Sequence, residues 1–329
     1  MPLRRFGAAA GAALLAATVL AATVLAATVL LAAAPARAAT PTFTKLVAFV
    51  RAGDVFVSKG ATERRLTSGG GHARPRWSPD GSRIAYLRDG YLWVMNADGS
   101  GKRRVTSYPA HGPSWTRDGR AIAFVSGWCA YLVSSTTPNA VPSAVADPGG
   151  GCATAPPAGP WIPSGSLVDR LRGDRSVAVS TGGTFLAAPL AADDCAAFDS
   201  ALTYFVLSNG AEVECLAFFG GGDELPGFAV VPAWRPDDRR LAWTAYREGA
   251  VWGEGDVTPE DPVHVEEYDL TTRVKRRIGR PLDRELEYVS TTRALVTGQH
   301  NNGSWLILID LVSGARTPFR QGSQADYQG

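Results

Sequence analysis

The sequence has few of the residues and none of the motifs that mark common enzymes. It holds only four histidines and four cysteines in 329 residues. It contains no HExxH, G-x-G-x-x-G or P-loop motif, and no G-x-S-x-G nucleophile elbow. CxxC pairs and EF-hand spacing are missing as well, so no metal and no cofactor is predicted. By motif, nothing marks the chain as an enzyme.

An excess of charge of one sign is also lacking. The chain has 33 basic and 31 acidic residues, and three of the basic ones lie in residues 1–38, which contain no acid. The remainder therefore has 30 basic and 31 acidic residues, a net charge of −1. This balance gives no electrostatic reason to expect nucleic acid as a partner.

The first 38 residues have the pattern of a secretory signal peptide. Arg4 and Arg5 precede an uncharged, apolar stretch over residues 6–34, and residues 36–38 read Ala-Arg-Ala, the A-x-A form of a cleavage site. We expect cleavage after Ala38 and a secreted or extracytoplasmic protein. The alternative is an uncleaved membrane anchor, because about 20 apolar residues suffice to span a bilayer. Membrane contact is expected only through this segment.

The four cysteines suggest disulfides, because an even number in an exported chain favours oxidised pairs. Three pairings are possible, and pairing between sequence neighbours predicts Cys129–Cys152 and Cys195–Cys215. The alternative is a set of free thiols in the core.

A repeated pattern is the strongest signal in the sequence. Residues 72–86, 110–124 and 229–243 each contain Pro-x-Trp, then a polar turn, then a short apolar run. A weaker copy lies at 159–168. The tryptophans at the shared position are Trp77, Trp115, Trp234 and, in the weaker copy, Trp161. We expect them to pack between neighbouring units.

The first full copy shows how such a unit folds. Proline disfavours helix before Trp77, so that segment is extended. In the turn that follows, Pro79 presets φ, Asp80 can bond its own backbone and Gly81 tolerates positive φ. Asp118 and Gly119 take these places in the next copy. Apolar runs at 83–87 and 91–95 and a run at 102–106 complete four strands in about 38 residues, close to one propeller blade.

The pattern WSPDG…IAY…LWVMNADGSG…VT resembles the WD-repeat-like element of TolB-like β-propellers. The resemblance implies an all-β propeller of four-stranded antiparallel blades. Seven candidate units begin near residues 45, 72, 110, 158, 195, 230 and 285, with degenerate middle copies, so six or seven blades are expected. We place the propeller at 45–322, after a linker at 39–44 and before a C-terminal tail at 323–329. The first unit lacks a strand, which the tail or residues 40–44 could supply.

Propeller geometry also predicts a binding face. Loops before the first strand and between the second and third strands surround one mouth of the channel, where polar groups can converge on a ligand. The candidate binding residues on this face are His72, Arg74, Arg88, His111, Trp128, Glu248, Trp252, His300 and Asn301. The alternative is that they are ordinary solvated loop residues.

Together these features predict an exported, monomeric, non-enzymatic module that binds a protein, peptide or cell-wall ligand. TolB-like relatives act in cell-envelope assemblies, so the resemblance implies a role of this kind. The alternative is a lyase or glycosidase at the channel mouth, which would need paired carboxylates about 5–9.5 Å apart. Its first candidates are Glu248, Glu254, Asp256 and His111.

Overall fold

The computed structural model describes residues 40–146, 164–191, 193–221, 226–247, 251–252, 256–257 and 261–329. Residues 40–329 form one compact unit. The predicted signal segment 1–38 lies outside the described residues. Within the described part, no helix is long and apolar enough to cross a membrane.

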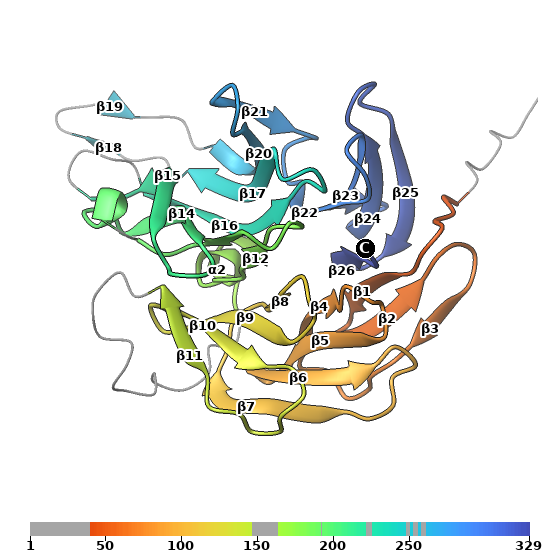
Figure 1. Cartoon of the computed structure of the whole chain (residues 1–329). Helices are drawn as coiled ribbons and strands as arrows, with labels where there is room; N and C mark the ends of the chain where they lie inside the picture. The colour runs from red at the N-terminus through yellow and green to blue at the C-terminus, as the bar shows by residue number, and fades with distance from the viewer. Residues whose placement is uncertain are drawn as a thin grey trace, which may run out of the picture. The chain divides into compact units, whose positions relative to one another are not determined.

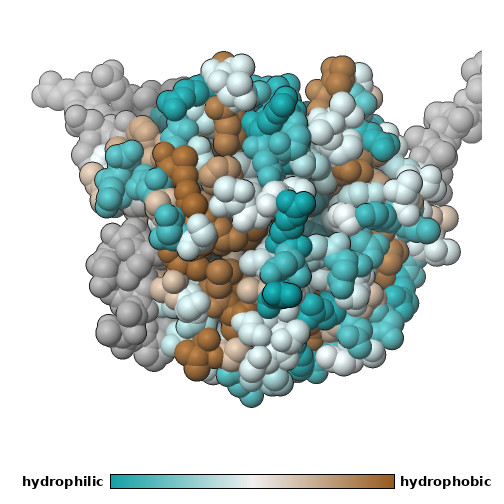
Figure 2. Space-filling model, in the orientation of Figure 1, coloured by the Kyte–Doolittle hydropathy of each residue, from teal (hydrophilic) through white to brown (hydrophobic). Residues whose placement is uncertain are grey.

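Six four-stranded antiparallel sheets stand around a central axis as the blades of a β-propeller (Figure 1). The predicted fold class is therefore confirmed. In the same view, Figure 2 shows hydrophilic residues down the middle of this face and hydrophobic residues gathered to their left.

The first three blades each place four strands in order from the axis outward. The first blade has β26 (Ser323–Tyr327), β1 (Val47–Arg51), β2 (Asp54–Ser58) and β3 (Glu63–Arg65). The second has β4 (His72–Trp77), β5 (Arg83–Arg88), β6 (Tyr91–Asn96) and β7 (Arg103–Pro109). The third has β8 (Ser114–Trp115), β9 (Ala121–Ser126), β10 (Cys129–Ser134) and β11 (Ser143–Ala146).

The other three blades follow the same plan. The fourth has β12 (Ala178–Val179), β13 (Phe185–Ala188), β14 (Ser200–Val206) and β15 (Glu212–Phe219), with helix α2 (Leu167–Arg172) before it and the 3-10 helix η1 (Asp193–Cys195) inside it. The fifth has β16 (Gly227–Trp234), β17 (Arg240–Arg247), β20 (Asp261–Asp269) and β21 (Val274–Ile278), and the small hairpin of β18 (Val251–Trp252) and β19 (Asp256–Val257) is inserted in it. The sixth has β22 (Arg284–Tyr288), β23 (Arg293–His300), β24 (Gly303–Asp310) and β25 (Arg316–Gln321).

The count of seven units is corrected to six. The candidate units near 158 and 195 belong to one blade, whose innermost strand ends at Val179. This strand lacks both the Pro and the Trp of the repeat, and its turn is recognisable only by Gly182 and Gly183. Trp161 lies outside the described residues.

The C-terminal segment closes the ring. Strand β26 pairs antiparallel with β1, with Val47 opposite Tyr327 and Ala48 opposite Asp326. The strand missing from the first unit is therefore supplied by residues 323–327 and not by residues 40–44. Most of the expected C-terminal tail is part of a blade. The first blade is therefore built from both ends of the described chain.

The turn after Trp77 forms through the residues that make it recognisable in the sequence. The Ser78 hydroxyl donates to Asp80 Oδ1 at 2.6 Å, and Gly81, at φ +68°, donates its N–H to the Ser78 carbonyl at 2.8 Å. The hydrogen bond from the Ser78 hydroxyl, with those from Ser82, lowers the pKa of Asp80 to about 2. Asp118 and Gly119 form the corresponding turn in the third blade.

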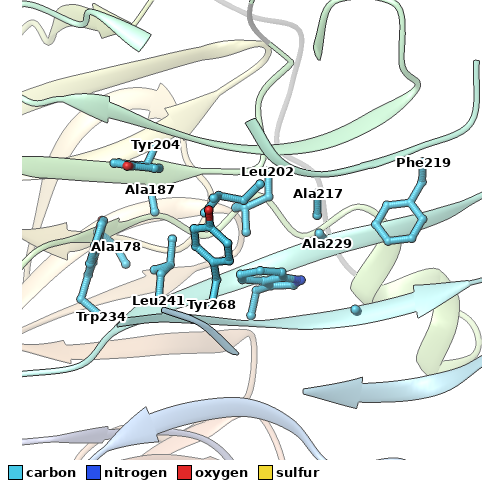
Figure 3. Close-up of a cluster of buried hydrophobic side chains, with 13 residues drawn as sticks. Ala178, Ala187, Leu202, Tyr204, Ala217, Phe219, Ala229, Trp234, Leu241 and Tyr268 are labelled. Carbon is cyan, nitrogen blue, oxygen red and sulfur yellow. The ribbon is translucent and has the colours of Figure 1, made fainter. Parts of the chain in front are cut away.

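The core lies between the blades. Trp77, Trp115 and Trp234 are all buried. The Trp234 indole Nε1 donates to the carbonyl of Ala178 in the fourth blade at 3.0 Å, and the Trp115 indole donates to the carbonyl of Arg76 in the second at 2.9 Å. Figure 3 shows Trp234 in the cluster that joins the fourth and fifth blades. Each of these two indoles thus joins its blade to the one before it.

One predicted disulfide is present. Cys195 of η1 is bonded to Cys215 of β15, with Cα atoms 6.0 Å apart, which secures η1 against its own blade. Cys129 is also disulfide-bonded. Its predicted partner, Cys152, lies outside the described residues.

Candidate functional site

The innermost strands of four blades share an irregularity, which lies three residues before the Trp or Tyr that ends each of these strands. The residues at this position, from the first blade to the sixth, are Gln324, Arg74, Gly112, Ser176, Val231 and Glu285. Four of them adopt positive φ, namely Arg74 (50°), Val231 (55°), Glu285 (54°) and Gln324 (58°). The ladder register shifts beside each of the four, as in a β-bulge. Strain of this kind gathers at sites where side chains must be aimed.

Arg74 reaches from the second blade to groups on two other parts of the ring. Its Nε donates to Asp174 Oδ2 at 2.9 Å, and its Nη2 lies 3.0 Å from Glu285 Oε1 and also contacts Asp174. Asp174 precedes the fourth blade and Glu285 lies in the sixth. These three charged groups therefore meet where alternate blades converge.

Burial would neutralise these groups, but their mutual attraction keeps them charged. Burial raises the pKa of Asp174 and of Glu285, yet the Arg74 guanidinium and local hydrogen bonds outweigh it, and both pKa values lie below their usual range. Burial lowers the pKa of Arg74, and the two carboxylates raise it by more. Ser176 and Thr297 donate further hydrogen bonds to the carboxylates, at 2.5 and 2.8 Å.

One donor of this cluster is unused. Arg74 is only 3% exposed, and its Nη1 has no hydrogen-bond partner within the described part of the chain. Leaving a buried donor unpaired costs about 1–3 kcal/mol. Arg74 therefore has one N–H group left that an acceptor on a ligand would satisfy.

A pocket of about 270 Å³ opens beside this cluster. Its lining includes His72, Arg74 and His111, so the structure brings together three of the predicted binding residues. Its other charged or polar lining side chains are Asp89, Asp174 and Gln324. Burial lowers the pKa of His111 to about 4, so its imidazole is neutral near pH 7. His72 Nδ1 lies 3.1 Å from Asp54 Oδ1 and 3.2 Å from the Gly53 carbonyl.

Two of the predicted residues lie outside this pocket, in surface contacts. The Arg88 guanidinium lies over the Trp93 ring at 5.1 Å and near Asp89 at 3.7 Å. The His300 ring packs edge-on against Trp305 at 5.1 Å.

The remaining predicted residues also lie away from the pocket or outside the described part of the chain. Asn301 and Asn302, at φ 47° and 58°, form the two-residue turn between β23 and β24. Glu248 and Glu254 lie outside the described residues. Trp252 and Asp256 have described backbones, in β18 and β19, but their side chains are not among the described ones.

Three residues of the site escaped the sequence prediction. Glu285 and Gln324 stand three residues before Tyr288 and Tyr327, as Arg74 stands before Trp77. Aligning the tyrosines with the tryptophans would have found both. Asp174 lies in the connection after α2, where the repeat offers no signal.

A second pocket, also of about 270 Å³, is lined by Asp174 as well. It includes Trp128, another predicted binding residue, with Arg172, Arg175 and Asp199. Among the described residues, no cluster of three or more His, Cys, Asp or Glu side chains could hold a metal ion.

Comparison with known proteins agrees with the repeat. No family model matches the sequence. A curated relative, the Tol-Pal system protein TolB of Anaeromyxobacter dehalogenans, is 56% identical over 45 residues, which cover 12% of this chain and 10% of that protein. The chain thus matches only a small part of this relative's length.

Solved structures extend the likeness to most of the propeller. TolB from Acinetobacter baumannii has a TM-score of 0.60 at 14% identity, covering 88% of this chain and 67% of that one. The putative TolB from Agrobacterium tumefaciens has a TM-score of 0.53 at 15% identity, covering 80% and 87%. A chain of a nidogen/laminin complex reaches 0.58 at 9% identity, covering 87% and 98%. The predicted resemblance is therefore confirmed, and this chain has the fold of a six-bladed TolB-like β-propeller.

Proposed function

We propose that this chain is an exported, non-enzymatic module that binds a protein or peptide segment at its channel mouth, at the cell envelope or outside the cell. The observation that carries the proposal is the Arg74 cluster, with its unpaired buried donor beside a pocket. The second blade, the sixth blade and the connection before the fourth blade hold the buried cluster, so little ordering cost remains when a ligand binds.

The charges of the pocket indicate which segment it would accept. Arg74 is outweighed by Asp174 and the exposed Asp89, which line the pocket with it, and by Glu285, which pairs with it. This excess of negative charge favours a neutral or basic segment and disfavours an acidic one. A carbonyl oxygen of such a segment could accept from Arg74 Nη1, which would satisfy the orphaned donor.

Two further observations support the location and the type of partner. A disulfide is expected in an oxidising compartment. The curated relative is described as a protein of the Tol-Pal system, which supports a protein partner.

The alternative is an enzyme, and one observation favours it, namely that Asp174 and Glu285 converge at the channel mouth. Glycoside hydrolysis, however, needs one carboxyl that stays protonated to act as the general acid. Arg74 keeps the pKa of both carboxylates low, so neither is suited to that role. Binding therefore accounts for this geometry better than catalysis does.

Capture from an envelope or secreted fraction tests the proposal. The purified protein, tagged at one end, should retain a partner that is identified by mass spectrometry. Asp89→Lys should reduce the recovered partner about tenfold, because one charge at the rim changes sign. Asp193→Lys is the matched control, since Asp193 is also exposed but does not line the pocket.

Two results would overturn the proposal. One is equal capture by the wild type and Asp89→Lys. The other is the absence of any captured partner together with lyase or hydrolase turnover by the purified protein, which would favour the enzyme alternative.

A further inference from the structure

Trp128 is presented to solvent on a rigid support. It lies in the two-residue turn between β9 and β10, after Gly127 at φ +61°, and it is 64% exposed. The next residue, Cys129, is disulfide-bonded. A large aromatic side chain at such a position leaves apolar surface in water, which a purely structural role does not require.

The orientation of this indole is fixed by a neighbour. The Arg175 guanidinium lies over the Trp128 ring, 3.6 Å from its centroid, and its Nη1 donates to the Gly127 carbonyl at 3.0 Å. The cation covers one face of the ring, and the exposed surface of the indole remains as a platform beside the pocket.

The pocket beside Trp128 holds a cation and an anion that do not pair with each other. Arg175 is partly buried and makes no ion pair with any described carboxylate, and burial lowers its pKa. Asp199 lines the same pocket and makes no side-chain hydrogen bond or ion pair with any described residue. The Asp199 carboxylate and the Arg175 N–H groups other than Nη1 are therefore available to a ligand.

The balance of charge restricts the ligand class. Among the described residues that line the pocket, Arg172 and Arg175 are balanced in number by Asp174 and Asp199, so this part of the lining has no excess of either sign. A phosphate would meet the carboxylates, and an ammonium group would meet the guanidinium groups. A neutral sugar suits both, because each hydroxyl both donates and accepts hydrogen bonds. The C–H face of a sugar ring can also pack on the electron-rich face of an indole.

We propose that this pocket, formed by Trp128, Arg175 and Asp199, binds a neutral saccharide. The pocket, at about 270 Å³, is close to the smallest ligand sites, about 300 Å³, and so would take a single sugar ring of a longer chain. Asp174 lines both this pocket and the Arg74 pocket, and the other lining residues of the two differ. The inference goes beyond the proposed function and does not depend on which partner the channel mouth binds.

Titration of the purified, folded protein with soluble trisaccharides tests the inference. The probes are cellotriose, maltotriose and triacetylchitotriose, with binding followed by calorimetry and by the indole N–H signals in NMR. At least one should bind saturably and shift one indole signal, which Trp128→Ala should remove. Trp128→Ala and Asp199→Asn should each weaken binding about tenfold, and Trp128→Phe should weaken it less. Val312→Ala is the control, because Val312 is 81% exposed on another blade.

The inference is overturned if none of the three trisaccharides binds saturably, or if Trp128→Ala and Asp199→Asn bind as the wild type does. It is also overturned if triglycine binds in a manner that depends on Trp128 while the saccharides do not, since the pocket would then be a peptide site. Both replaced side chains are exposed, so the variants should fold as the wild type does, which circular dichroism checks.

Discussion

Replacing Arg74 by methionine should destabilise the propeller strongly. The guanidinium contacts Asp174 and Glu285, and all three groups are at least nine-tenths buried. Removing one partner of a buried ion pair costs about 3–5 kcal/mol, because the other charge is left without compensation. This is a large share of the roughly 5–15 kcal/mol typical of a folded protein. Methionine and arginine tolerate the positive φ at this position equally poorly. The loss of stability therefore measures the removal of the charge and not a change in backbone strain.

Urea unfolding at pH 7, followed by tryptophan fluorescence, measures this loss. The triple variant Arg74→Met, Asp174→Asn, Glu285→Gln should recover at least about 2 kcal/mol, because none of these three buried positions then carries a charge. Asn and Gln keep an oxygen that can accept from the Ser176 and Thr297 hydroxyls. Arg120→Met, at an arginine that is 88% exposed, should leave stability unchanged.

The pH dependence of this loss has a definite sign. In the wild type the pKa values of Asp174 and Glu285 are lowered, so their contribution to stability is present above the unfolded value near 4 and is lost as pH falls. Without Arg74, burial should raise both pKa values. The difference in the free energy of unfolding between the wild type and Arg74→Met should therefore shrink as pH falls from 7 to about 4.5. A deficit that is equal at both pH values, or a triple variant no more stable than Arg74→Met, would refute the reasoning.

Three other predictions concern the ring. Burial raises the pKa of Asp326 to about 6, so stability should fall as pH rises from about 4 through 6. Asp326→Asn should remove up to about 3 kcal/mol of that fall in urea titrations. Glu287, whose pKa is also raised, should contribute a further decline. Replacing Cys195 and Cys215 by alanine opens a loop with a sequence separation of 20 and should cost about 3 kcal/mol, and a reducing agent should then have less effect on the melting temperature than in the wild type. Trp234→Phe removes the indole donor to the carbonyl of the fourth blade and should cost about 1–3 kcal/mol, whereas an unchanged denaturation midpoint would show that this hydrogen bond contributes nothing.

The sequence predicts the blades best where the turn and the tryptophan occur together. Trp77, Trp115 and Trp234 each follow an extended segment and precede a turn of small polar residues, and all three begin well-formed hairpins. The innermost strand of the fourth blade, β12, has neither the Pro nor the Trp of the repeat, and packing between the third and fourth blades holds it in place. Without these signals, the sequence predicts two units where the structure has one blade.

The sequence predicts the residues of the site that lie next to a clear copy of the repeat, and it does not predict the others. His72, Arg74 and His111 precede the two clearest tryptophans, so the repeat alone places them at the channel mouth. Glu285 comes from a degenerate copy and Asp174 from a connection without a pattern. Their contacts with Arg74 bridge blades far apart in the sequence, which no local signal encodes.

The ring has a repeated backbone but not six equal sites. The same backbone position bears a different side chain in every blade, from Arg74 to Glu285. At Gly112 a Cβ atom would collide with the Ser176 hydroxyl and press on the Arg74 side chain, so glycine there leaves the room that Arg74 and the Asp174 loop occupy. The third blade thus has no side chain at this position, which leaves space for Arg74 of the second blade to extend toward the axis. Among the six described blades, only one site combines the Arg74 donor with the carboxylates of Asp174 and Glu285. A partner that binds there should therefore bind with a stoichiometry of one partner per chain.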